Sequence, residues 1–328
     1  MLTRRRLLAG GSSLPILLTL PNAGFAQQPW PKSPVTMIVP FPPGGQADLA
    51  ARPIAEALQR ILGVTVIVEN RAGAGGAVGN AAAAKAAGDG ATILMTLSSL
   101  AVLPEANRIF DKPPLYEVDQ LKPIARVLAD PTLLAVPAAA PWKTVADLVE
   151  DAKKRPGVIT YGSSGTYGTL HVAMEMFAHA AGIRLVHVSY RGAGPALNDL
   201  VGGQIQALAS APGVLKPQVD AGKLRVLANW GAKRVESFPD TPTFMELGYG
   251  QVEFYIWAGL FVPASLPDDL TTRLRDAMKA AMADVSVQKI FATAGSPPAY
   301  QDAAEFAAFV TGDSSRLIAA VRTIGKVE

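Results

Sequence analysis

The chain has 328 residues, a formal net charge of +3 and no cysteine, and 49% of its residues are hydrophobic. The absence of cysteine excludes a disulfide framework, thiol catalysis, cysteine-ligated zinc and a lipid-modified N-terminal cysteine. The length suffices for two domains with ample cores. After the N-terminal leader no segment reaches the roughly eighteen unbroken apolar residues of a transmembrane helix, so we expect a protein that does not itself span the membrane.

The first 26 residues have the pattern of an export signal peptide. Three arginines at residues 4–6 precede a short apolar stretch, Leu14–Leu20, and Gly24-Phe25-Ala26 supplies the small residues that a signal peptidase reads. The order Thr-Arg-Arg-x-Leu-Leu also resembles a twin-arginine signal, so twin-arginine and general secretory export both remain open. We therefore expect a periplasmic protein whose signal peptide is cleaved near Ala26.

Removal of this leader changes the charge of the chain. It holds three of the 30 basic residues and no acidic one, which leaves 27 basic and 27 acidic residues in the mature protein. No run of lysines and arginines with interleaved aromatic residues follows. We therefore expect no nucleic-acid partner.

The first predicted strand, residues 36–39, leads into a rigid loop tipped by glycine. Three prolines stiffen this loop, and Gly44 and Gly45 let a ligand approach their N–H groups closely. A helix is predicted over residues 48–61, and the free N–H groups and partial positive charge of its N-terminus suit a carboxylate or phosphate. The loop is therefore predicted to bind an anion, and a plain strand-to-helix turn capped by Asp48 is the alternative.

The chain alternates apolar β-rich runs with helical patterns, which is typical of α/β layers around mainly parallel sheets. The first unit is predicted to continue with strands at 64–68 and 92–97, a helix at 77–87 and a long proline-rich loop at 104–123. A second unit is predicted to begin near Val127, with strands at 133–136, 158–161, 185–188, 205–209 and 224–228. Its predicted helices are 145–154, 168–181, 195–201 and 215–221.

The C-terminal part is predicted to hold one strand, 257–262, and helices at 268–283, 285–293 and 303–323. These helices need a sheet to cover, and the first unit lacks enough strands of its own. We therefore predict that the chain returns to the first unit near Tyr255. Lobe 1 then comprises residues 27–126 and 255–328, and lobe 2 comprises 127–254. Two crossings would join the lobes around a ligand cleft.

A second loop of the same kind follows the strand predicted to end at Tyr161. It combines glycine with hydroxyl residues before a predicted helix and reads Gly162-Ser163-Ser164-Gly165-Thr166-Tyr167-Gly168-Thr169. Hydroxyls and backbone N–H groups can both donate to a carboxylate. If both loops lie on the inner edges of their lobes, two helix N-termini face one anion. The alternative is a helix cap alone.

Other chemistries fit these motifs less well. The run from Gly73 to Gly79 lacks the third glycine of a dinucleotide-binding fingerprint, and Gly162-Ser-Ser-Gly165 lacks the spacing of a hydrolase nucleophile elbow. The three histidines are eight residues apart, which does not suit zinc, and we expect His171 to pack behind the second loop. We therefore expect no catalytic residue, no metal and no cofactor.

Six motifs follow one another in a specific order and spacing over nearly the whole mature chain. They are Ile38-Val-Pro-Phe-Pro-Pro-Gly-Gly-x-x-Asp48, Val68-Glu-Asn-Arg-x-Gly-Ala-Gly-Gly76, Gly162-Ser-Ser-Gly165 with His171, Tyr190-Arg-Gly-Ala-Gly-Pro-Ala196, Ala221-Gly-Lys-Leu-Arg225 and Asp240-Thr-Pro-Thr243. With these motifs the chain resembles the substrate-binding proteins of tripartite tricarboxylate transporters, the Bug-type periplasmic receptors.

The resemblance implies an α/β, type II periplasmic-binding-protein fold whose two lobes close on a small organic carboxylate. It implies a receptor without enzymatic activity that delivers its ligand to a cognate membrane permease, and we expect a monomer. The binding residues carried over from the first loop are Phe41, Pro43, Gly44, Gly45 and Asp48. Those from the second loop are Ser163, Ser164, Gly165, Thr166 and Thr169, and a third loop adds Ser210.

Two departures from the family pattern bear on the ligand. Tyr167-Gly168 stands where many members have glycine followed by serine or threonine, so either Thr169 supplies the missing hydroxyl or nothing does. Ser210 stands where members often carry Asp or Asn. This favours a plain organic acid over an amino acid, although Asp48 remains available to pair with an ammonium group. A ligand sensor for a histidine-kinase ectodomain, and an exported hydrolase or isomerase that uses the same cleft, remain as alternatives.

Overall fold

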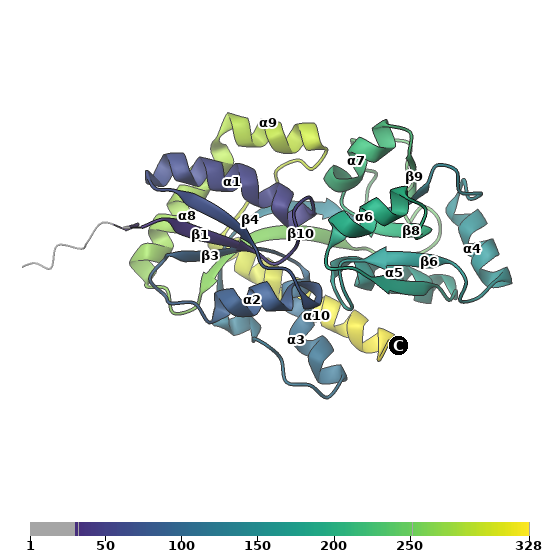
Figure 1. The fold of residues 1–328 in the computed structure, drawn as a ribbon, viewed down its shortest axis with the longest axis horizontal. Helices are drawn as coiled ribbons and strands as arrows, with labels where there is room; N and C mark the ends of the chain where they lie inside the picture. Colours follow the sequence, from purple (N-terminus) through teal and green to yellow (C-terminus); the bar gives the residue numbers. More distant parts are fainter. Residues whose placement is uncertain (1–29, 32, 251, 328) are drawn as a thin grey trace, which may run out of the picture.

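The computed structural model describes residues 30–31, 33–250 and 252–327. The predicted signal peptide, residues 1–26, lies outside them. Two α/β lobes lie side by side, with the N-terminal and C-terminal parts of the chain in one lobe and the middle of the chain in the other (Figure 1). No helix in the described part of the chain is long and apolar enough to cross a membrane.

Lobe 1 is built on a six-stranded sheet with the order β11-β4-β10-β3-β1-β2. Its strands are β1 (Val35–Val39), β2 (Val66–Asn70), β3 (Thr92–Leu97), β4 (Leu121–Pro131), β10 (Tyr255–Pro263) and β11 (Gln301–Asp302). Strand β1 is parallel to β2 and β3, whereas β10 runs antiparallel between β3 and β4. Strand β10, which begins at Tyr255, therefore lies in the sheet of the N-terminal part of the chain.

Helices cover both faces of this sheet. Helices α1 and α8 pack together on one face, and α3 and α10 pack together on the other (Figure 1). The helices of lobe 1 are α1 (Gln46–Leu62), α2 (Ala77–Ala84), α3 (Ser99–Ile109), α8 (Asp268–Ala283), α9 (Val285–Ala294) and α10 (Ala303–Ile324), with short 3₁₀ turns at η1 (Ala74–Gly76) and η2 (Val118–Gln120). Helix α1 buries Ala47, Ile54 and Leu58 along one side and ends at Gly63, which has the left-handed conformation (φ +68°) that suits glycine.

Lobe 2 is built on a five-stranded sheet with the order β7-β6-β8-β5-β9. Its strands are β5 (Leu133–Pro137), β6 (Thr160–Ser163), β7 (Val186–Ser189), β8 (Ala207–Ser210) and β9 (Leu224–Asn229). Its helices are α4 (Val145–Lys154), α5 (Thr169–Ala181), α6 (Ala193–Val201) and α7 (Pro212–Asp220). Strand β6 is parallel to β7 and β8, and β5 is antiparallel to β8 and β9.

The loop predicted over residues 104–123 is shorter in the structure, because helix α3 takes up its first residues and strand β4 its last. Helix α3 continues through Pro104, because Leu100, Val102 and Leu103 are buried and their packing outweighs the hydrogen bond that proline cannot make. Strand β4 begins at Leu121 and includes Pro123. Its neighbour β11 pairs only with Ala125 and Arg126, so the strand is open on that side at the proline.

The two connections between the lobes lie next to each other. Strand β4 stays in the first sheet to Pro131, so the predicted lobe boundary at 126/127 falls inside this strand. At the crossing the backbone N–H of Trp230 donates to Thr132 at 2.8 Å, and the N–H of Phe254 donates to the carbonyl of Trp230 at 2.9 Å. The outgoing and returning chains are therefore bonded together where the lobes join.

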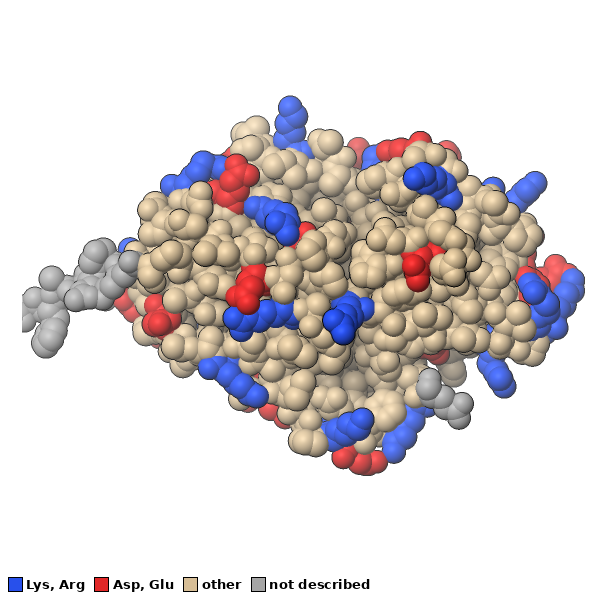
Figure 2. Space-filling model, viewed as in Figure 1, with Lys and Arg blue, Asp and Glu red and all other residues tan. Residues whose placement is uncertain are grey.

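Basic and acidic side chains are interspersed on the face shown in Figure 2, and no stripe of a single sign crosses it. Several ion pairs join side chains of opposite charge in the described part of the chain, as between Arg71 and Glu69 (2.6 Å) and between Arg275 and Asp302 (2.5 Å). This surface does not have the clustered positive charge of a nucleic-acid-binding face.

Candidate functional site

The loop between β1 and α1 is held by Asp48, which is buried in the first turn of α1. Its carboxylate accepts hydrogen bonds from the N–H of Gly44 (3.0 Å), from Asn70 Nδ2 (3.1 Å) and from Arg52 (2.8 and 2.9 Å). Burial raises the pKa of Asp48, but these hydrogen bonds outweigh it and lower the pKa below its ordinary value. Asp48 therefore shapes the loop, and its oxygens are already engaged within lobe 1.

The loop between β6 and α5 rests on two histidines, the buried His171 and the partly buried His187. Ser163 Oγ lies 2.6 Å from His187 Nε2 and accepts a hydrogen bond from the N–H of Gly165 (3.1 Å). His171 Nδ1 accepts a hydrogen bond from the N–H of Tyr167 (3.0 Å), so the expectation that His171 packs behind this loop is confirmed. Burial lowers the pKa of His171 to about 3 and that of His187 to about 4, which keeps both rings neutral at neutral pH.

A small cavity lies between the lobes where these two loops meet. Its volume of about 10 Å³ holds about one water molecule, so the lobes must separate to admit a carboxylate with its carbon skeleton. The residues that line it come from both lobes and include no Lys, Arg, Asp, Glu or His: Phe41, Gly45, Gln46, Leu97, Ser164, Leu170, Ala193, Ser210 and Ile256.

Three of these residues carry polar atoms without a partner. Ser164 Oγ, Ser210 Oγ and Gln46 Oε1 are buried and make no hydrogen bond within the described part of the chain. Buried polar groups are nearly always paired, and an unpaired one is destabilising. Gly45 and Gln46 at the start of α1 also line the cavity, and the N–H of Gln46, the first of the helix, has no acceptor within it. The cavity therefore presents hydroxyl and backbone donors that an anion would satisfy.

Four of the predicted site residues line this cavity: Phe41, Gly45, Ser164 and Ser210. The other seven lie elsewhere. Pro43 and Gly44 are exposed, Asp48 and Ser163 are engaged within their own lobes, and Gly165 and Thr166 line an adjoining groove. The hydroxyl of Thr169 accepts a hydrogen bond from Ser98 Oγ of lobe 1 at 3.4 Å. Sequence reasoning missed Gln46, although its place directly after two glycines at a helix start was a usable signal.

A buried carboxyl group holds Gln46 from behind. Gln46 Nε2 donates a hydrogen bond to Asp130 Oδ2, and Asp130 lies opposite Ile256 near the end of β4. Burial raises the pKa of Asp130 to about 7, although hydrogen bonds from Ser296 and Gln46 act in the opposite direction. This contact fixes the amide of Gln46 at the cavity wall. Sequence reasoning missed Asp130, because Asp followed by Pro is typical of a turn.

The lobes meet at glycines. A Cβ atom placed on Gly165 would lie 2.7 Å from Gly75 Cα in lobe 1, and one on Gly192 would lie 2.5 Å from Pro42 Cδ. One on Gly194 would lie 2.9 Å from the carbonyl oxygen of Pro43. Real Cβ atoms do not approach other atoms so closely, so these glycines permit the contact between the lobes.

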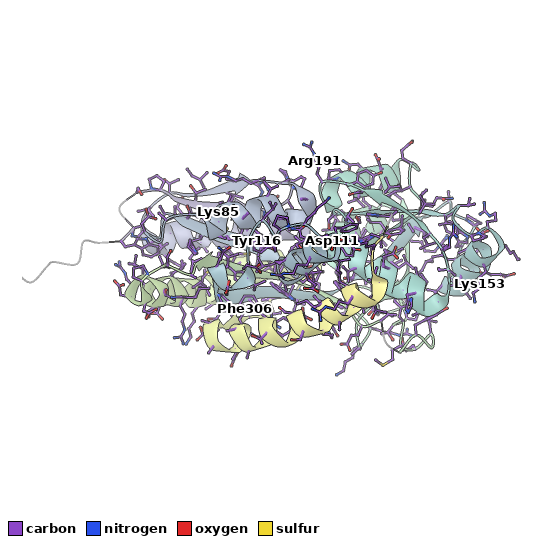
Figure 3. The ribbon with its side chains drawn as sticks, turned by 90° about the horizontal axis from the view of Figure 1, so that it is seen from below. Lys85, Asp111, Tyr116, Lys153, Arg191 and Phe306 are labelled. Carbon is purple, nitrogen blue, oxygen red and sulfur yellow. The ribbon has the colours of Figure 1, made fainter. Side chains whose placement is uncertain are left out.

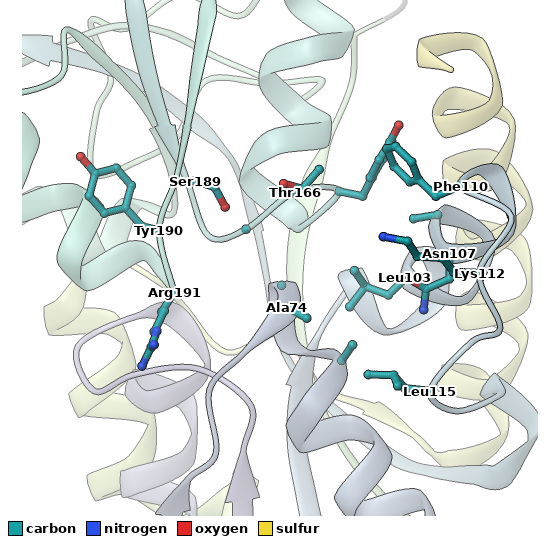
Figure 4. Close-up of a pocket in the computed structure, with 15 residues that line it drawn as sticks. Ala74, Leu103, Asn107, Phe110, Lys112, Leu115, Thr166, Ser189, Tyr190 and Arg191 are labelled. Atoms are coloured by element: carbon teal, nitrogen blue, oxygen red, sulfur yellow. The ribbon is translucent and has the colours of Figure 1, made fainter. Parts of the chain in front are cut away.

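Next to this contact runs an open groove of about 480 Å³ whose walls come from both lobes (Figure 4). Lys112 lies on the lobe 1 side and Arg191 on the lobe 2 side, and no Asp or Glu is among the lining residues. The aromatic residues Phe110, Tyr167 and Tyr190 border this groove and not the small cavity.

Comparison with known proteins agrees with this geometry. The family described as tripartite tricarboxylate transporter family receptor matches residues 50–326. Protein BugT of Bordetella pertussis is 33% identical over 297 residues, which cover 90% of each chain. Two similar solved structures are a periplasmic transporter (36% identity, TM-score 0.85, 89% of this chain and 97% of that chain) and Rpa4515 of R. palustris with adipate (29% identity, TM-score 0.84, 90% and 98%). The predicted fold and family resemblance are confirmed: the chain belongs to the tripartite tricarboxylate transporter receptor family, the Bug-type extracytoplasmic solute receptors.

Proposed function

We propose that this protein is a periplasmic receptor that binds a small organic carboxylate between its lobes and delivers it to the membrane subunits of a tripartite tricarboxylate-type transporter. The observation that carries the proposal is the pair of unpartnered, buried hydroxyls of Ser164 and Ser210, which line one cavity between the lobes. The adipate named with the related R. palustris protein supports the ligand class. The predicted leader supports the location.

In this proposal one carboxylate oxygen accepts hydrogen bonds from the hydroxyls of Ser164 and Ser210. The other faces the first N–H groups of α1, where the helix dipole adds a favourable interaction. Because the ligand contacts α1 from lobe 1 and the serines from lobe 2, it binds lobes that are parted just enough to hold it better than fully open ones. Ligand binding therefore shifts the protein toward closure.

The lining of the cavity also favours an organic acid without an ammonium group as the ligand. An amino-acid ligand carries an ammonium group, which needs an anionic or strongly accepting partner once it is buried. No carboxylate lines the cavity, and Asp48 already accepts hydrogen bonds from Arg52, Asn70 and Gly44. Gln46 Oε1 remains as a neutral acceptor that suits a ligand hydroxyl or a water molecule.

The serine hydroxyls provide a direct test. Ser164→Ala and Ser210→Ala should each weaken carboxylate binding about tenfold or more, because a hydrogen bond to a charged group is worth about 1.5–3 kcal/mol. Titration calorimetry with the bound acid measures this change. Thr166→Ala is the matched control, because Thr166 is exposed in the same loop and lines only the groove. Equal losses in all three variants would show that the anion does not lie in the small cavity.

We further propose that the receptor does not transform its ligand. Ser163 and His187 lie 2.6 Å apart, as a nucleophile and its base would, but neither residue lines the cavity. Ser163 Oγ also donates to the carbonyl of Gly165 at 3.1 Å, and the ring of His187 packs on Tyr161 and His171. This pair supports the second loop from behind.

A further inference from the structure

Tyr167 in the second loop has a backbone conformation that favours glycine. Its φ of +55° lies in the left-handed region, where a residue with a side chain is strained, yet the side chain is large and almost completely buried. Such a conformation persists only where the surroundings hold it. Two hydrogen bonds hold the backbone of the loop at this point. The N–H of Tyr167 donates to His171 Nδ1, and the N–H of Gly168 donates to the carbonyl of Gly165.

The side chain of Tyr167 leaves lobe 2 and contacts the C-terminal tail. Its hydroxyl donates a hydrogen bond to the carbonyl of Gly325 and accepts one from the N–H of Val327 at 3.2 Å. Its ring packs edge-on against Phe110 of lobe 1, with 5.7 Å between ring centroids. The tail, residues 325–327, follows α10, which runs along lobe 1 toward the lobe boundary (Figure 3).

The tail itself is tied to lobe 1. Lys326 of the tail pairs with Asp111 at 2.9 Å, and Arg322, in the last turn of α10, pairs with Glu105 of α3 at 2.7 Å. Helix α10 also packs along α3. The two hydrogen bonds of the Tyr167 hydroxyl therefore join the lobes, and separation of the lobes must break them.

We propose that Tyr167 is a positioning residue that latches the binding loop, residues 163–169, onto the C-terminal tail and so holds the receptor closed. The effect of Tyr167 on ligand release rests on the proposed function. The contact between Tyr167 and the tail, and its effect on closure, do not. The loop carries Ser164 at the cavity and Gly165 at the contact with Gly75, so the latch places both. Loss of the latch leaves the ligand contacts intact, and it favours the open state and speeds dissociation.

The test measures closure in the ligand-free mature protein. The chain contains no cysteine, so Lys112→Cys and Arg191→Cys place two unique spin labels on the facing walls of the groove (Figure 4). Dipolar distance measurements then compare this background with Tyr167→Phe and with a chain ending at Ile324. We expect each change to move the closed-to-open ratio about tenfold toward the longer distance, because two hydrogen bonds of ordinary strength are lost.

The combined variant should show no further shift, because both changes remove the same bonds. Tyr249→Phe is the control, since its ring packs with Phe177 and Phe244 within lobe 2.

Distance distributions that match the background in both latch variants would overturn the proposal, as would additive effects in the combination. A lower unfolding temperature with an unchanged distribution would assign the hydroxyl a purely structural role. If Tyr167→Phe does not fold, the truncated chain decides the question alone. Since no ligand is added, the outcome does not depend on the carboxylate proposal.

Discussion

Gly192→Ala should weaken ligand binding about 10- to 100-fold while each lobe stays folded. Gly192 has an extended backbone (φ 172°, ψ 176°) that any residue adopts, so alanine introduces no strain in lobe 2. Its Cβ would lie 2.5 Å from Pro42 Cδ, an atom of a rigid ring in lobe 1. The clash therefore exists only when the lobes close, and overpacking of this kind costs about 1–3 kcal/mol. Titration calorimetry measures the affinity, and thermal unfolding checks the fold.

The control for this prediction is Gly250→Ala. Gly250 lies in a loop of lobe 2, and a Cβ there has no atom within 4 Å. Gly165→Val should also block closure, but φ is +122° at Gly165, so that variant strains its own loop as well. If Gly192→Ala bound its ligand as tightly as the parent protein, closure of the lobes at Pro42 would not be part of binding.

Asp130→Asn should stabilise the protein at pH 8 by an amount on the order of 4 kcal/mol and have little effect near pH 4. The pKa of Asp130 is raised from 3.8 to about 7 in the folded protein, mainly by burial. Between these two pH values the carboxyl group of Asp130 is ionised in the unfolded chain but stays protonated in the folded protein. The free energy of unfolding therefore falls as the pH rises from about 4 to about 7, and is constant above that range. Asparagine does not ionise, so it avoids this decrease in the free energy of unfolding, and its side-chain oxygen still accepts the hydrogen bond from Gln46.

Denaturant unfolding of both proteins at several pH values between 4 and 8 tests this result. Asp302→Asn provides a comparison of opposite sign, because the hydrogen bond and charge of Arg275 lower the pKa of Asp302. The Asp302 carboxylate stabilises the folded protein at pH values above the pKa of this residue in the unfolded chain. This stabilisation is lost as the pH falls through the lower pKa of Asp302 in the folded protein. A difference between Asp130→Asn and the parent protein that does not change with pH would mean that Asp130 is not protonated by burial.

Local sequence signals were sufficient for most of the fold. Helices at 145–154 and 268–283 and the strand at 92–97 have the predicted limits, because capping residues, proline and glycine mark their ends. The α3 helix and the start of β4 were missed, since both contain proline, whose local preference was overridden by burial against α10 and by an open strand edge. Such packing depends on residues about 200 positions away and leaves no local pattern.

The site was predictable only in part. Glycine and hydroxyl motifs identified the two loops, but the direction of each side chain depends on tertiary contacts. Asp48 turns toward Arg52 and Asn70, and Ser163 turns toward His187, whereas the adjacent Ser164 lines the cavity. Ala193 and Ile256 reach the cavity from elements distant in sequence. Ile256 lies in no motif, and Ala193 belongs to the motif at residues 190–196, which by itself did not indicate a contact with the ligand.

The central claim is that the cavity between the lobes binds a carboxylate, and thermal unfolding of the mature, ligand-stripped protein tests it most directly. The panel comprises mono-, di- and tricarboxylates, aromatic acids and amino acids. A ligand at about one hundred times its dissociation constant adds roughly 2.7 kcal/mol, which raises the midpoint by several degrees. We predict a selective shift with an organic acid, which is recovered unchanged. No shift with any carboxylate, in protein shown to be folded and empty, would contradict the account, and so would conversion of the acid to a product.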